Sequence, residues 1–191
     1  MIIAGCDPHF TKLAFSLVEY TKEKGRSHIR TDYFPIPDLA QKKKSLRQSE
    51  ITNQKLEKIF LMSYRWLKEY KPDAFGIEGF QAFSNPKSGF SVGKTTIVKM
   101  SSAVTAVKCA VFAMGKFPME GSAQGTRWAV LNKKGGSKEE VWEAVFPRYP
   151  NLKFPNVAEG NKEHIYDSLA IAEVALLDIL EQIKRRGALE I

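Results

Sequence analysis

The first part of the chain alternates short apolar runs with polar turns, a pattern typical of a small antiparallel sheet. The apolar run Ile2–Cys6 predicts a buried strand that ends at Asp7-Pro8. Two further strands are expected over Leu13–Tyr20 and Ser27–Ile36, because the polar segment between them contains Gly25, which suits a tight turn. The chain is therefore expected to open with three antiparallel strands.

The rest of the chain reads as helices alternating with short strands. Apolar residues recur at helical spacing from Leu46 to Tyr70, and Lys71-Pro72 ends that helix. The other expected elements are a strand over Ala74–Glu78, a loop over Ser84–Gly93, a helix over Thr95–Met114, strands over Lys116–Glu120 and Trp128–Leu131, a helix from Ser137 to Phe146 and a helix over Lys162–Arg186. This order predicts a single α/β domain over residues 1–191, with a mixed five-stranded sheet flanked by helices; Trp128–Leu131 is a further strand-like stretch outside that count.

Composition adds a basic charge and disfavours several classes of protein. The chain has 29 Lys and Arg against 21 Asp and Glu, a formal net charge of +8, which favours a polyanionic partner such as nucleic acid. Many basic proteins bind no nucleic acid, so charge alone does not decide this. Cys6 and Cys109 lie in apolar stretches, which argues against a disulfide framework or a zinc site. No segment resembles a signal peptide or approaches the length of a membrane span, so a cytoplasmic protein without membrane contact is expected.

Acidic residues occur where an apolar run ends or a helix begins. Asp7 follows the first strand, Glu78 ends a later one, and His164 and Asp167 are spaced to share one face of the last helix. Taken singly, Asp7 is more often a turn residue before proline, Glu78 is equally well a paired buried carboxylate, and the last two residues are often a cap and a surface residue. Together they predict a site for divalent cations, as used in phosphodiester hydrolysis.

The same patches resemble the motifs of RuvC-type Holliday junction resolvases, which belong to the ribonuclease H-like superfamily. The resemblance runs in order over nearly the whole chain. The matching segments are Asp7-Pro8 with Thr11-Lys12 for the family's Asp-Pro-Gly-x-Thr-Arg, Ile77-Glu78 for its Ile-Glu, Arg127 for an upstream basic residue, Ser137–Val141 for its Glu-Lys-x-x-Val, and His164-x-x-Asp167 with Ser168–Ala172 for its closing helix.

The resemblance implies a ribonuclease H-like fold and a homodimeric, Mg²⁺-dependent endonuclease that nicks two strands of a four-way DNA junction symmetrically. It assigns two metal ions per site to Asp7, Glu78 and Asp167, with His164 as the fourth member of the site. Lys138 would hold a phosphate or offset developing charge in catalysis. Arg127 would do the same. For both cations, a solvated surface position is an equally supported interpretation.

The sequence departs from the family pattern in three places. His9-Phe10 stands where glycine and leucine usually follow Asp-Pro. His164 stands where many members have aspartate, which could shift the metal preference towards Mn²⁺. The family's base-stacking aromatic corresponds to Gln81, so Phe80 or Phe83 is the candidate to stack on junction bases, although burial is the more frequent fate of a phenylalanine.

Other functions remain open at this point. Ser88–Thr95 differs by one residue from a phosphate-binding P-loop, but no buried strand directly precedes it, which disfavours a nucleotide triphosphatase. In the resolvase interpretation, Lys87 and Lys94 lie on a DNA-facing loop and helix. A different ribonuclease H-like nuclease, acting on RNA or on mobile elements, would share the metal site. A non-catalytic branched-DNA-binding module with a degenerate site is the third alternative.

A homodimer is expected from the mechanism rather than from a motif. Two symmetric nicks need two active sites, and a two-fold protein matches a two-fold junction. The small-residue helix around Ser101, Ala103 and Ala106 or the helix Leu46–Tyr70 could form the interface, and core packing explains both patterns equally well. No sequence feature identifies helper proteins for branch migration.

Overall fold

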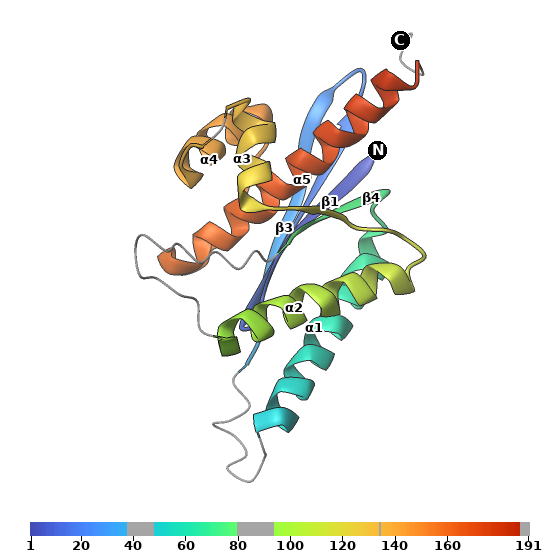
Figure 1. Ribbon diagram of the computed structural model, residues 1–191. Coiled ribbons are helices and arrows are strands. Elements are labelled where there is room, and N and C mark those ends of the chain that lie inside the picture. Colours follow the sequence, from blue (N-terminus) through green and yellow to red (C-terminus); the bar gives the residue numbers. More distant parts are fainter. Residues whose placement is uncertain (38–47, 80–93, 134, 188–191) are drawn as a thin grey trace.

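The protein is built in three layers around one mixed sheet (Figure 1), in a computed structural model that describes residues 1–37, 48–79, 94–133 and 135–187. The strands are β1 (Ile2–His9), β2 (Lys12–Thr21), β3 (Gly25–Pro35), β4 (Ala74–Glu78) and β5 (Met119–Gly121). The helices are α1 (Gln48–Tyr70), α2 (Lys94–Ala113), α3 (Ala123–Leu131), α4 (Lys138–Val145), the short 3₁₀ helix η1 (Phe146–Arg148) and α5 (Glu159–Arg185). Helices α1 and α2 cover one face of the sheet, and α5 crosses the other with α3 and α4 beside it.

The predicted sheet is confirmed. Its strand order is β3-β2-β1-β4-β5, with β1, β2 and β3 antiparallel, β4 parallel to β1, and β5 parallel to β4. The helices predicted within 46–70, 95–114 and 162–186 are present with small shifts at their ends. The predicted α/β architecture, a mixed five-stranded sheet with three leading antiparallel strands flanked by helices, is therefore correct.

Strand β1 continues through the position where the sequence predicted its end. Asp7 pairs with Ala14 and Pro8 pairs with Leu13, so the interpretation of Asp7 as a turn residue is wrong. Proline fits here because β1 pairs with β4 only as far as Cys6, and no β4 acceptor needs an amide at Pro8. The extension carries the Asp7 side chain on a regular strand.

The segment Trp128–Leu131 was expected to be a strand, and this prediction is wrong because it forms the end of α3. The Ser122 side chain accepts a hydrogen bond from the Gly125 amide and so caps the start of the helix. Thr126 and Val130 lie four residues apart and are both buried, which is a helical spacing. The short apolar run Trp128–Leu131 suggested a strand only because the helix cap at Ser122 was not taken into account.

The start of α4 is fixed by the capping pattern that the sequence predicted. The Ser137 side chain accepts a hydrogen bond from the Glu140 amide, and the Glu140 carboxylate accepts one from the Ser137 amide. This capping box sets where the first helical turn begins. It thereby places Lys138 at the end of α4 that faces α5.

Helix α5 touches the backbone of the sheet at two glycines. Gly5 of β1 and Gly76 of β4 are register partners on neighbouring parallel strands. A Cβ atom on Gly5 would lie 2.2 Å from the carbonyl oxygen of Ser168 and 2.3 Å from the amide nitrogen of Ala172. A Cβ atom on Gly76 would lie 3.0 Å from its nearest neighbour on α5. The helix can approach this closely only because both positions lack a side chain.

The glycine contact also orients the acidic residues. Asp7 follows Gly5 by two positions and Glu78 follows Gly76 by two, so each carboxylate lies on the same sheet face as its glycine. That face is the one covered by α5, on which Asp167 immediately precedes the contact residue Ser168. One packing contact therefore brings three acidic residues to the same end of the sheet.

One helix has the length and composition of a membrane span, contrary to the expectation that no segment would. Thr95–Ala113 of α2 has a mean hydropathy of 1.4, and 28% of that stretch is buried. Its inner face, including Ala103, Val107 and Val111, packs in the core against α1 and the sheet. A core helix can meet the same criterion, so length and apolarity alone do not assign this helix to a membrane.

We expect Gly5→Ala to destabilise the protein by about 1–3 kcal/mol or more, because the added methyl group meets helix backbone that cannot rotate away. Gly160→Ala is the control, since a Cβ atom there meets nothing within 4 Å and alanine favours a helix. Urea unfolding followed by circular dichroism measures both changes. Equal unfolding midpoints for the two variants would contradict the proposed contact.

Candidate active site

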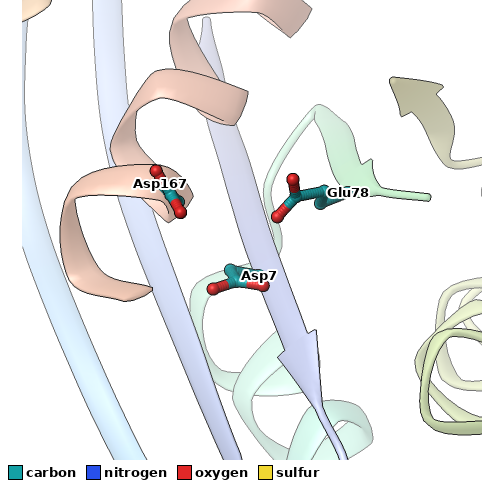
Figure 2. A group of neighbouring side chains, drawn as sticks. All are labelled: Asp7, Glu78 and Asp167. Atoms are coloured by element: carbon teal, nitrogen blue, oxygen red, sulfur yellow. The ribbon is translucent and has the colours of Figure 1, made fainter. Parts of the chain in front are cut away.

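Three carboxylates from three separate elements meet at the end of the sheet. Asp7 of β1, Glu78 at the end of β4 and Asp167 of α5 each offer an oxygen within 4.8 Å of the other two. Figure 2 shows the three side chains turned towards one another between the strands and the helix. They line a cleft of about 220 Å³ together with Pro8, His9, Gly79, Met100, Val104, Ala123, Lys138 and His164.

Charge repulsion and burial act together on Glu78. Burial, together with the nearby charges of Asp7 and Asp167, raises the pKa of Glu78 to about 9. Burial also raises the pKa of Asp167, although Lys138 opposes that change. Three ionised carboxylates at this spacing are unfavourable without a compensating cation. Their oxygens are the hard ligands that Mg²⁺ and Mn²⁺ prefer, so the donor set fits a divalent ion.

His164 lies against Asp7 rather than in the group of three carboxylates. Its Nδ1 donates a hydrogen bond to Oδ2 of Asp7 at 2.5 Å. Its ring lies 5.6 Å from the ring of His9, whose Nδ1 contacts Oγ1 of Thr11 at 2.8 Å. Burial lowers the pKa of His9, and His164 lowers it further. His164 is thus placed to orient Asp7, and its role as a metal ligand stays a prediction.

Lys138 lies at the rim of the carboxylate group. Its Nζ donates to Oδ2 of Asp167 at 2.6 Å and also contacts the Glu163 carboxylate. Burial lowers the pKa of Lys138, but the carboxylates of Asp167 and Glu163 outweigh this effect and raise it overall. The ammonium group therefore remains charged beside the site, and its role in holding a phosphate stays a prediction.

The fold was compared with known proteins. No protein-family model and no curated protein sequence matches the chain. Thermus thermophilus RuvC in complex with a Holliday junction substrate matches with a TM-score of 0.71 and 19% identity, covering 95% of this chain and 96% of that one. A second T. thermophilus RuvC structure gives 0.69 and 20%, covering 98% and 97%. The yeast mitochondrial Holliday junction resolvase Ydc2 gives 0.62 and 13%, covering 95% and 80%.

The chain has the fold of the RuvC resolvases. The resemblance inferred from the motifs is therefore confirmed at the level of the fold. These two matches span nearly the full length of this chain. Asp7, Glu78 and Asp167 lie on β1, β4 and α5, which the fold itself brings together.

The structure describes some of the remaining predicted site residues and not others. Arg127 of α3 lines a small hollow of about 20 Å³ together with Glu78, Lys138 and Asp167. Lys94 is the first residue of α2, and its side chain lies outside the described residues. Phe80, Phe83 and Lys87 lie outside the described residues altogether, as does Ser88–Gly93 of the P-loop-like segment.

Trp142 is a site residue that sequence reasoning missed. Its Nε1 donates a hydrogen bond to Oδ1 of Asp167 at 3.1 Å. Trp142 follows Lys138 by four positions in α4, so the two side chains share a helix face and reach the same carboxylate. The four-residue spacing between Lys138 and Trp142 was the sequence feature that could have indicated Trp142 as a site residue.

The described part of the protein also contains a hollow that is larger than the candidate site. A space of about 660 Å³ lies between β5, α3 and α5, with Met119, Trp128 and Leu177 in its lining. Within the described parts of the chain, the one group of side chains spaced to hold a metal is that of Asp7, Glu78 and Asp167. The chemistry therefore assigns the site to the smaller cleft.

We expect Glu78→Gln to stabilise the protein in the presence of a chelator, and more so as the pH rises. Because the pKa of Glu78 is raised from 4.5 to about 9, the folded wild type loses stability as the pH increases across that range. Glutamine carries no titrating charge, so the advantage of the variant should grow up to about pH 9 and then level off. Urea unfolding at several pH values measures it.

Glu181→Gln is the control for this experiment, because Glu181 pairs with Arg185 at the exposed end of α5, away from the carboxylates. Its effect on the free energy of unfolding should not follow the same pH dependence. A Glu78→Gln advantage that is constant with pH would show that burial and the neighbouring carboxylates do not raise the pKa of Glu78 as described.

Proposed function

We propose that this protein is a structure-selective endonuclease that resolves four-way DNA junctions by paired symmetric nicks, using two divalent ions per active site. The observation that supports it best is the convergence of Asp7, Glu78 and Asp167 within 4.8 Å on a RuvC fold. The formal net charge of +8 favours a polyanionic substrate. The T. thermophilus RuvC match is itself a complex with a Holliday junction.

The carboxylates would hold the ions, and the residues around them would prepare the site. When bound, two Mg²⁺ or Mn²⁺ ions supply an activated water for in-line attack on the phosphate and stabilise the departing 3′ oxygen, leaving 5′-phosphate and 3′-hydroxyl ends. His164 holds the Asp7 carboxylate through its 2.5 Å hydrogen bond. The hairpin of β1 and β2 and the helix α5 are both rigid elements, so the oxygens are oriented before the substrate binds.

Two cations beside the carboxylates suit the scissile phosphate. Lys138 lies in the cleft, and Arg127 lines the adjoining hollow that also contains Glu78 and Asp167. Both side chains can donate to phosphate oxygens and offset the negative charge that develops on them. A DNA strand passing over the cleft would therefore meet carboxylates for metal binding and cations for its backbone at one place.

We expect Asp7→Asn to abolish cleavage of a four-way junction while leaving junction binding nearly intact. Asparagine keeps the shape of the side chain and an oxygen that can accept the hydrogen bond from His164, but it removes a charged metal ligand. A labelled synthetic junction, a linear duplex and a structured RNA are each incubated with Mg²⁺, Mn²⁺ or chelator. Electrophoresis measures cleavage, and gel shift in chelator measures binding.

Paired symmetric nicks on the junction alone, lost in Asp7→Asn and in chelator, would support the proposed function. Preferential cleavage of RNA would instead support another ribonuclease H-like nuclease. Tight junction binding by the wild type without any cutting in either metal would support a non-catalytic binding module. Equal loss of binding and cleavage in Asp7→Asn would count against Asp7 as a metal ligand.

We further propose that the protein acts as a homodimer through the outer face of α2. Val98 and Phe112 are 60% and 50% exposed, and Ser101, Thr105 and Cys109 are exposed between them at helical spacing. This stripe contains no charged residue. Beyond it, Phe117 is 84% exposed and packs its ring edge-on against Phe112. An uncharged stripe of this length is typical of a protein–protein contact.

Helix α1, the other interface that the sequence left open, fits this role less well. Its exposed positions include Glu57, Arg65, Lys68 and Glu69, which suit contact with water. Ala103 of α2, counted among the small residues of a possible interface, is buried in the core of the protomer. A second copy of this chain is the occupant that a symmetric pair of nicks requires.

We expect Thr105→Glu to convert a dimer into a monomer, because it places two carboxylates at the middle of the uncharged stripe. Lys68→Glu on the exposed face of α1 is the control and should stay dimeric. Analytical ultracentrifugation measures the mass of each. A monomeric wild type at micromolar concentration, or a Thr105→Glu variant that remains dimeric, would contradict the assignment.

A further inference from the structure

We infer that Trp142 is a positioning residue that holds the Asp167 carboxylate in the orientation needed for divalent-ion binding. This inference rests on the proposed function only in that it concerns the same metal site. Trp142 does not touch the cleft's other carboxylates in the contacts described. Its effect would pass entirely through one hydrogen bond to Asp167.

The two oxygens of Asp167 have different partners. Nε1 of Trp142 donates to Oδ1 at 3.1 Å, and Nζ of Lys138 donates to Oδ2 at 2.6 Å. Donors on both oxygens fix the plane of the carboxylate, whereas one donor would leave it free to rotate about the Cβ–Cγ bond. Each oxygen keeps a further lone pair for a metal ion. The carboxylate is thus oriented but still able to act as a ligand.

The two donors differ in charge, and this makes the indole the more useful one for metal binding. Lys138 is a cation that neutralises Asp167 and competes with a metal for its charge. The Trp142 N–H is neutral and orients the carboxylate without cancelling its charge. Without that N–H group, Lys138 would be the remaining donor described for Asp167, and the carboxylate could turn towards it and away from Asp7 and Glu78.

An aromatic cluster holds the Trp142 ring in place. Trp142 packs edge-on against Tyr166, with ring centres 5.1 Å apart. Tyr166 in turn contacts Phe146 at 5.0 Å and Phe154 at 4.9 Å. These four rings join α4, η1 and α5 through the segment that follows η1, so the indole cannot turn without disturbing several packed side chains.

The chain contains a matched control for losing a hydrogen bond between an indole and a carboxylate. Nε1 of Trp66 donates to Oδ2 of Asp32 at 2.8 Å, and Trp66 is 3% exposed. Trp66 lies on α1, on the opposite face of the sheet from α5. Trp66→Phe therefore removes the same kind of bond from the same kind of residue without touching the carboxylate cluster.

The test measures Mn²⁺ binding by the full chain from the loss of the free-ion signal in electron paramagnetic resonance. We expect Trp142→Phe to weaken binding about 10- to 100-fold, as is usual when a residue that orients a metal ligand is lost. Trp142→Tyr, which also lacks the indole N–H, should weaken it similarly. Trp66→Phe should keep wild-type affinity. Junction cleavage by Trp142→Phe should recover at high Mn²⁺, because the defect lies in ion affinity.

Wild-type Mn²⁺ affinity in folded Trp142→Phe and Trp142→Tyr would overturn the inference. Equal weakening by Trp66→Phe would also overturn it, because the effect would then be general destabilisation. A wild type that binds no Mn²⁺ at the carboxylates would overturn it as well. If the wild type binds Mn²⁺, the Trp142 variants bind it more weakly and the wild type cuts no junction, the proposed function would be contradicted and the positioning role of Trp142 would still be supported.

Discussion

The contact between α5 and the bare backbone of two glycines determines the rest of the site. Gly5 and Gly76 lie side by side on parallel strands. The helix backbone at Ser168 and Ala172 reaches Gly5, and Ile171 and Ala175 pack against Gly76. Because a strand places every second residue on the same face, the carboxylates two positions beyond these glycines must face the helix. The close packing of α5 on these two glycines therefore sets the spacing of the acidic group.

The same contact creates repulsion among three carboxylates, which a bound cation would relieve. It brings partly buried carboxylates within 4.8 Å of one another, and the raised pKa of Glu78 is the consequence. Neighbouring side chains offset this repulsion only in part. Lys138 contacts Asp167, and His164 contacts Asp7. A site kept under repulsion in this way favours divalent ions, which gain from every oxygen that the fold has already oriented.

Much of this could be predicted from the sequence, and the failures have physical causes. Parallel strands end at one edge of a sheet, so an acidic residue after each of two apolar runs already suggested that Asp7 and Glu78 would meet. The end of β1 was misplaced because strand pairing, which local sequence does not report, outweighed the turn preference of Asp-Pro. The error at Trp128–Leu131 came from reading a short apolar run without its cap. Trp142 was missed because its partner is a residue 25 positions away.

If β1, β4 and α5 together form a metal site, anomalous diffraction from crystals soaked in Mn²⁺ should locate the ion among their carboxylates. We expect an anomalous peak in contact with oxygens of Asp7, Glu78 and Asp167, at about 2.0–2.3 Å as is usual for a hard divalent cation. A peak elsewhere in the molecule, with the three carboxylates held instead by Lys138 and His164 alone, would contradict it.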